Sequence, residues 1–128
     1  MSKRNKNPIV ELKEMNGKEC IYFTFKGIFT SDDAENAIKD WKTLIGSKKT
    51  KQVTLIWECL EMKNYEIGAR TAWQKAIKDL KNEIDMIWLI TDSIVIQAGA
   101  EIISFFTSYD IRIVGSKEEL IEQMTLKV

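Results

Sequence analysis

The chain has 128 residues with 19 basic and 19 acidic side chains, so its formal net charge is zero. That length suits one domain with a sizeable hydrophobic core, and the balanced charge favours neither nucleic acid nor a membrane surface as a partner. Histidine is absent, which removes the commonest general base and the commonest metal ligand.

The cysteines and the N-terminal residues indicate the cellular compartment in which the protein is expected. Cys20 and Cys59 lie far apart and lack a metal-binding or redox spacing, so we interpret both as buried free thiols of a reducing compartment. Residues 1–8, MSKRNKNP, are basic and polar with no apolar run behind them, which predicts a disordered tail and neither a signal peptide nor a membrane anchor. Residues 9–128 are expected to form a single cytoplasmic domain without membrane insertion.

The first predicted element is a β-hairpin. Strand-like patterns cover residues 9–15 and residues 20–25 or beyond. Asn16-Gly17 between them is the strongest short hairpin signal, because both turn residues tolerate positive φ. In the second strand three apolar residues share the inward face: Ile21, Phe23 and Phe25.

Beyond the hairpin, helices and strands alternate. Thr30-Ser31-Asp32-Asp33 offers caps for a helix that Gly46-Ser47 ends, and Ser116 with Glu119 forms a capping box for a short last helix. Between these helices we expect strands over residues 52–60, 86–90 and 111–114, a helix over about 65–82, and another helix after Thr91-Asp92-Ser93. This order predicts an α/β fold with a mixed sheet of about five strands, in which an N-terminal antiparallel hairpin precedes β-α-β-α-β-α crossovers.

Acidic residues occupy two kinds of position. Glu58 lies inside an apolar strand, where a carboxylate must be paired or near the rim, and we expect the rim. Others follow the carboxyl ends of strands, where ligands bind in open α/β sheets: Asp32, Asp33, Glu61, Glu66 and Asp92. All of these except Glu61 begin helices, where capping already explains a carboxylate, so we predict no metal site. With no Gly-rich loop at these turns, we also predict no nucleotide or other cofactor.

Two segments carry a resemblance to a known family: LIWECLEMKNYEIGARTAWQKAI and IWLITDSIVIQAGAEIISFFTSYDIRIVGSKEEL. With the predicted order of elements, nearly the whole chain resembles the sulfate transporter and anti-sigma factor antagonist (STAS) domain, in particular a stand-alone bacterial branch of it. That branch has an arginine and a tryptophan in helix two and an apolar helix three with small residues. The resemblance implies a STAS-like fold and a regulatory role like that of an anti-sigma factor antagonist.

The chain departs from the STAS pattern at the phosphorylation switch. STAS antagonists carry an Asp-Ser-Ser-Gly type motif after the third strand, and its first serine is phosphorylated by a partner kinase that is also an anti-sigma factor. The matching residues here are Asn64-Tyr65-Glu66-Ile67-Gly68, so Tyr65 stands in place of that serine. The serine switch therefore does not carry over, and a protein-docking surface remains.

We accordingly expect a non-enzymatic regulatory module that docks to an unidentified protein partner. The expected partner-binding residues are Met62, Lys63, Asn64, Tyr65, Glu66 and Arg70. For Tyr65 two interpretations stay open: its ring packs at the helix entry, or its hydroxyl is exposed. The alternative function is a small-molecule or lipid-binding STAS-like protein, which a closed apolar cavity of about 300 Å³ or more would favour.

The predicted third helix is apolar around most of its circumference, with Gln97, Glu101 and Ser104 in one narrow polar stripe. One sheet cannot bury so wide an apolar surface, so the excess meets neighbouring helices, a ligand or a second chain. We predict a homodimer or partner interface on the side away from the sheet, which includes Ile96, Ile103 or Phe106.

Overall fold

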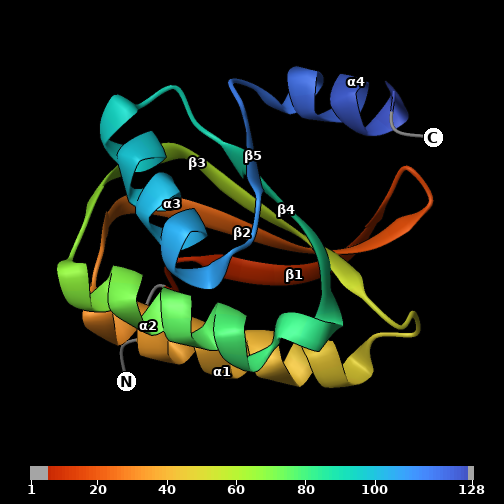
Figure 1. The fold of residues 1–128 in the computed structure, drawn as a ribbon, viewed down its shortest axis with the longest axis horizontal. Coiled ribbons are helices and arrows are strands. Elements are labelled where there is room, and N and C mark those ends of the chain that lie inside the picture. Colours follow the sequence, from red (N-terminus) through yellow and green to blue (C-terminus); the bar gives the residue numbers. More distant parts are fainter. Residues whose placement is uncertain (1–5, 127–128) are drawn as a thin grey trace.

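The computed structural model describes residues 6–126 as a five-stranded sheet with helices on both faces (Figure 1). In chain order the elements are β1 Ile9–Met15, β2 Lys18–Phe29, α1 Ser31–Ser47, β3 Val53–Tyr65, α2 Ile67–Asp79, the short 3-10 helix η1 Lys81–Glu83, β4 Ile84–Ile90, α3 Ile94–Thr107, β5 Ile111–Val114 and α4 Lys117–Leu126. The strands lie in the order β1-β2-β3-β4-β5; β1 pairs with β2 antiparallel, and the other pairs are parallel. The predicted α/β fold with a mixed sheet is confirmed. None of the helices between residues 6 and 126 has the length and apolarity to cross a membrane.

The turn between β1 and β2 follows from its sequence. Asn16 has a φ of 53° and Gly17 a φ of 77°, and a two-residue hairpin turn of type I′ requires positive values at both positions. Met15 pairs with Lys18 directly across this turn. The predicted hairpin is therefore confirmed.

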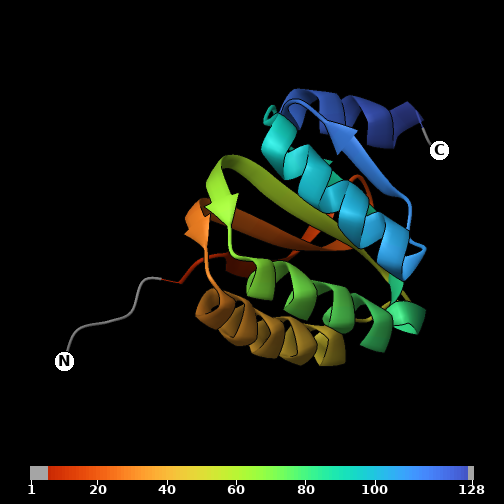
Figure 2. The ribbon, with the colours of Figure 1, turned by 60° about the vertical axis from the view of Figure 1, so that its left-hand side comes forward.

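Helices α1, α2 and α3 cover one face of the sheet and enclose the larger hydrophobic core (Figure 2). α1 and α2 lie side by side, and Trp73 of α2 is at the centre of the packing. Its ring centroid lies 5.1–6.3 Å from those of five other aromatic residues: Phe23, Phe25, Phe29, Trp41 and Trp57. Aromatic pairs at such distances add stability beyond the area that they bury. The inward face predicted for β2 is fully part of this core.

α4 covers part of the other face, over β4 and β5, and buries Leu120 and Met124 there. Glu58 points to this face, and the residue is 7% exposed. The hydroxyl of Tyr22 donates to it at 2.5 Å, and the ammonium of Lys117 lies 3.1 Å away. The expectation that Glu58 points to the rim is wrong, because these two partners stabilise the carboxylate within the sheet. Burial, and secondly the bond to Glu58, raise the pKa of Tyr22.

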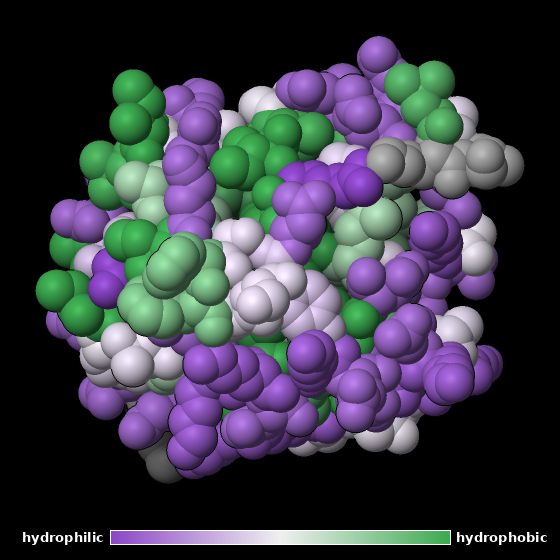
Figure 3. Space-filling view, in the orientation of Figure 1, coloured by the Kyte–Doolittle hydropathy of each residue, from purple (hydrophilic) through white to green (hydrophobic). Residues whose placement is uncertain are grey.

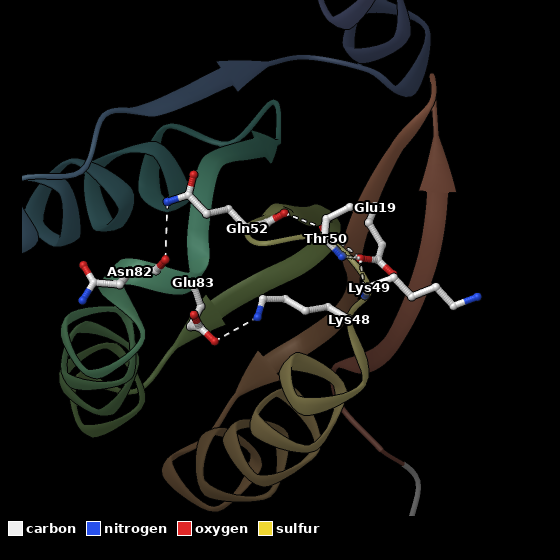
Figure 4. Close-up of polar contacts among 7 residues, drawn as sticks. All are labelled: Glu19, Lys48, Lys49, Thr50, Gln52, Asn82 and Glu83. Atoms are coloured by element: carbon white, nitrogen blue, oxygen red, sulfur yellow. Dashed lines mark hydrogen bonds and ion pairs between the residues drawn. The ribbon is translucent and has the colours of Figure 1, made fainter.

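Polar contacts occupy the amino ends of β3 and β4 (Figure 4). Glu19 of β2 accepts hydrogen bonds from the backbone N–H groups of Lys49 and Thr50, both at 2.9 Å. These bonds, that of Thr50 foremost, lower the pKa of the Glu19 carboxyl. Lys48 lies 2.9 Å from Glu83 and joins the end of α1 to η1. Because these side chains already have partners, the opposite end of the sheet is the better candidate for function.

The tail expected over residues 1–8 is described from Lys6 onward, and residues 1–5 lie outside the described residues. The side-chain amide of Asn7 donates to the carbonyl of Lys26 at 2.7 Å, and its oxygen accepts the Lys26 N–H at 2.8 Å. Asn7 therefore binds the backbone of β2 just before β1 begins.

β2 and β3 run further than predicted, and this changes the candidate site. β3 ends at Tyr65 rather than at residue 60, since β2 continues to Phe29 and keeps pairing with it. Two register shifts interrupt the pairing, one after Thr24 and one after Gly27. At each shift β3 contains one residue more than β2, which is the arrangement of a β-bulge and leaves an extra side chain outside the regular alternation.

Candidate functional site

The candidate site lies where β2, β3 and β4 end and the chain enters α1, α2 and α3. Thr30 and Asp33 form a capping box at α1, and Ser93 accepts a hydrogen bond from the first turn of α3. Glu66 precedes α2 and accepts the backbone N–H of Ser31 at 2.7 Å, which links the starts of α1 and α2. Both carboxylates thus satisfy backbone donors. Within residues 6–126 no group of three or more His, Cys, Asp or Glu side chains is placed to hold a metal ion.

The predicted partner-binding residues fall into groups of different exposure. Lys63, Asn64 and Glu66 are exposed. Tyr65 and Arg70 are half-buried. Met62 is only 8% exposed and belongs to the core, so its placement on a docking surface is wrong. The cause is the first register shift: Cys59 and Met62 both point into the larger core, although strict alternation would put them on opposite faces.

Tyr65 packs at the entry of α2. Its ring centroid lies 6.0 Å from the guanidinium carbon of Arg70, in the first turns of that helix. The ring also lies against α3, so closely that a Cβ on Gly99 would be 2.7 Å from the tyrosine oxygen. Of the two interpretations, the structure agrees with a ring packed at the helix entry. Tyr65 and Arg70 occupy the two positions of a hydrophobic staple, with a cation over the ring in place of an apolar contact.

A cavity of about 50 Å³ lies behind Tyr65, between α2, α3 and the sheet. Aromatic rings form much of its wall: Phe25, Phe29, Trp57 and Trp73. Its volume is far below the roughly 300 Å³ at which drug-sized sites begin. The large apolar cavity that would favour the small-molecule or lipid-binding alternative is therefore absent from this part of the described chain.

α3 has apolar side chains on two sides. Ile96 and Ile103 are 5% and 7% exposed and line the cavity, so the prediction that they lie on the side away from the sheet is wrong. Phe106, by contrast, is 53% exposed, and Phe105 beside it is 80% exposed. Figure 3 shows hydrophobic atoms gathered over α3, on the left of the view. The residues named for an interface on α3 therefore divide between the core and the surface.

Three exposed isoleucines at this end of the sheet were not predicted as site residues. Ile28 lies at the end of β2, Ile67 begins α2 and Ile94 begins α3, and they are 59%, 69% and 82% exposed. Large apolar side chains exposed at one edge are typical of a surface that meets a partner. For Ile67 and Ile94 the sequence offered a signal, because each lies in the first turn of a predicted helix, next to the end of a strand; Ile28 lies in β2 and had no such signal.

The cysteines offer no activated nucleophile. Cys20 and Cys59 are free and buried, as predicted. Burial raises the pKa of Cys20 to about 11 and also raises the pKa of Cys59. Since the thiolate is the reactive form of cysteine, both side chains are inert near neutral pH.

The fold defines the class only at the level of architecture: it is an α/β domain with an antiparallel hairpin ahead of a parallel sheet, as in the predicted STAS-like fold. No family model and no curated protein sequence matches the chain. Among solved structures, the chain is similar to an uncharacterized protein of the DUF3478 family with a SpoIIAA-like fold from Shewanella loihica PV-4, with a TM-score of 0.74 and 14% identity over 96% of this chain and 98% of that chain. It is also similar to the anti-sigma factor antagonist SpoIIAA in its unphosphorylated form, with a TM-score of 0.66 and 12% identity over 94% of this chain and 100% of that chain. The predicted STAS-like fold is confirmed, and at these identities the likeness concerns the fold alone.

Proposed function

We propose that this protein is a non-enzymatic regulatory module of the STAS type, which binds a protein partner at the carboxyl ends of β2, β3 and β4. The docking rim, as we define it, consists of Ile28, Lys63, Asn64, Glu66, Ile67, Arg70 and Ile94. The observation that carries the proposal is the exposure of its three isoleucines. They lie among both acidic and basic side chains, and an apolar centre with a polar surround is the usual composition of a protein interface.

Docking in this proposal does not use a serine switch. The segment from Asn64 to Gly68 contains no serine. Tyr65 occupies the position of the phosphorylated residue, and its hydroxyl end lies against Gly99 of α3. A kinase would have to pull the ring out of this packing before it reached the oxygen. Incubation with ATP and an antagonist-type serine kinase should therefore add no phosphate, whereas phosphate on Tyr65, found by mass spectrometry, would contradict this part of the proposal.

A role without catalysis is supported by the residue types that the chain contains. It has no histidine, and its two thiols are held in the protonated form by burial. Free thiols also favour a reducing compartment, and we propose the cytoplasm.

A capture experiment tests the docking rim. The tagged chain is immobilised, exposed to lysate of the native organism, and compared with Ile67→Asp, because a carboxylate at the centre of an apolar contact is strongly unfavourable for binding. Ile121→Asp is the matched control, since Ile121 is 54% exposed on α4, at a different face. We expect one protein to be retained by the wild type and by Ile121→Asp and to be lost with Ile67→Asp. Equal retention by all three would exclude the docking rim.

A second proposal concerns self-association through the exposed side of α3. Phe105 and Phe106 stack edge to face at 5.2 Å and together expose a large aromatic surface. We propose that a second copy of the chain covers it. Light scattering over a range of concentrations should show a dimer that Phe105→Glu abolishes. A wild-type protein that stays monomeric at every concentration would rule this interface out.

A further inference from the structure

α3 carries a second apolar stripe on a side that its own chain leaves largely uncovered. Its buried residues recur on one side of the helix: Ile96, Gly99, Ala100, Ile103 and Thr107. At 100° per residue, a different side holds Val95, Ala98, Ile102 and Phe105, of which all but the half-buried Ile102 are exposed. Figure 1 shows α3 in front of the sheet, with no other described helix over it.

The spacing of this stripe is that of a helix-pairing seam. Val95, Ala98, Ile102 and Phe105 follow one another at intervals of three, four and three residues. Apolar residues at these intervals occupy the a and d positions of a heptad, and such a stripe packs against another helix. We call these four residues the α3 seam. Its spacing favours a helix as the occupant.

The α3 seam is complementary to itself when two copies run antiparallel. A two-fold axis beside Ala100 places Val95 opposite the second copy's Phe105, and Ala98 opposite the second copy's Ile102. Every layer then joins a smaller side chain to a larger one, which fills the space between two helices evenly. In a parallel pair each residue would meet its own counterpart, so Ala98 would leave a gap while Phe105 would be crowded. The sizes of the side chains therefore fit a second copy in the antiparallel orientation.

The apolar surface along the seam suits a small interface. Val95, Phe105 and Phe106 are 53%, 80% and 53% exposed. At about 150–200 Å² for each large apolar side chain, these three expose roughly 280–370 Å² together. A standard interface buries about 800 Å² on each partner, so the three side chains supply more than a third of that area, and the rest of the exposed side of α3 adds to it. The area corresponds to the weak, transient class of dimer.

One acidic residue borders the α3 seam. Glu101 is exposed and belongs to none of the ion pairs among residues 6–126. Residues 82–111 contain no lysine or arginine, so the α3 helix of a second copy offers no cation to it. In the antiparallel pair the two Glu101 side chains lie on the same edge of the interface, beside the two-fold axis, and neighbouring like charges are unfavourable.

We propose that two copies of the chain associate through antiparallel α3 helices along the α3 seam, and that repulsion between their Glu101 side chains keeps this dimer weak. The proposal rests on the self-association proposed above. It adds the orientation of the two helices, the pairing of their side chains and the residue that limits the affinity. Such a dimer tightens as ionic strength rises, because salt screens the repulsion.

Cross-linking of single cysteine variants tests the orientation. At 1.5 Å per residue, the antiparallel pair offsets the two copies of residue 101 by about 3 Å along the helix axes and the two copies of residue 95 by about 15 Å. A bismaleimide whose spacer is shorter than the larger offset should therefore link Glu101→Cys into a covalent dimer and leave Val95→Cys unlinked. The native thiols do not interfere, because Cys20 and Cys59 are buried. Cross-linking of both variants would show a parallel pair and overturn the proposal.

Sedimentation equilibrium tests the role of Glu101. We expect Glu101→Gln to tighten the dimer at least about twofold at low salt, and high salt to remove the difference from the wild type. Glu122→Gln is the matched control, since it removes the same charge from an exposed position on α4, and it should dimerise like the wild type.

The possible failures are distinguishable. A wild-type dimer whose dissociation constant equals that of Glu101→Gln, or whose cross-links are those of a parallel pair, would overturn this proposal and leave the self-association itself intact. A wild type that stays monomeric at every concentration and salt would refute both. None of these results bears on the docking rim, which the capture experiment tests separately.

Discussion

Replacing Gly99 by alanine tests the packing that holds Tyr65 beside the cavity. A Cβ at this position would lie 2.7 Å from the Oη of Tyr65 and 2.8 Å from two of its ring carbons. Such distances are shorter than real carbon contacts, so the ring must move away from α3. It would then lose part of its contact with the core and with Arg70.

Two opposing effects set the size of the change. Alanine is the better helix former, and this favours the variant by about 0.5–1 kcal/mol. Forcing an extra methyl group into a packed site costs about 1–3 kcal/mol. We therefore expect Gly99→Ala to lower the free energy of unfolding by about 1 kcal/mol. In a Tyr65→Ala background the obstruction is gone, so the same substitution should raise the free energy of unfolding by about 0.5–1 kcal/mol.

Urea unfolding followed by far-UV circular dichroism measures all four proteins of this double-mutant cycle. The decisive observation is the sign of the effect of Gly99→Ala in the two backgrounds. If alanine stabilises both proteins, or destabilises both equally, the close contact between Tyr65 and α3 does not exist in solution. The cavity would then lack the wall that Tyr65 provides.

Three further predictions concern other parts of the fold. Burial raises the pKa of Tyr22 above its ordinary value of about 10, so the stability that its protonated hydroxyl gives the fold is complete below that pH and is lost as the pH rises further. Tyr22→Phe should therefore lose less stability than the wild type between about pH 9 and pH 11. Equal losses for the two proteins in urea unfolding would contradict this. Glu19→Ala should speed hydrogen exchange of the Thr50 amide, because that N–H donates to the Glu19 carboxylate. An unchanged exchange rate would show that the carboxylate does not hold the loop around Thr50. At protein concentrations at which the chain is monomeric, Ile103→Ala should lower the free energy of unfolding by about 2–5 kcal/mol and Phe105→Ala by less than about 0.5 kcal/mol, whereas similar effects would mean that α3 is oriented differently.

Much of the fold could be predicted because its signals act over a few residues. Asn16-Gly17 forms the turn by itself, and Thr30 with Asp33 caps α1 through bonds within one turn of helix. Alternation of Ile21, Phe23 and Phe25 likewise identifies the face of β2 that joins the larger core. Such features depend little on distant parts of the chain, so the order of helices and strands follows from them.

The candidate site was harder to predict because it depends on pairing between distant residues. After residue 58, β3 no longer alternates regularly: Cys59, Met62 and Tyr65 pack toward the same core at a spacing of three. Of the two register shifts that cause this spacing, only the second has a local sign in the sequence, because Gly27 lies beside it in β2 with a φ of 58°. Arg70 was identified through the family resemblance, since its unpaired Nε–H becomes visible only in three dimensions.

The third helix, α3, shows a different limit of prediction from the sequence. Periodicity groups its apolar residues into sides, but it cannot tell which side meets α2 and the sheet. Ile96 and Ile103 belong to the buried side, while Phe106 belongs to the exposed side. Both sides have similar residue types, so composition offers no way to choose between them.

The two register shifts between β2 and β3 also affect how this protein can change in length. Each shift holds one residue that has no counterpart on the neighbouring strand. Removing such a residue, for example Leu60, would restore regular pairing and leave Met62 facing the core. A deletion within residues 54–58, which pair with strands on both sides, would displace the side chains that follow it. Evolution can therefore reshape the rim around Tyr65 by single insertions and deletions while the centre of the sheet keeps its register.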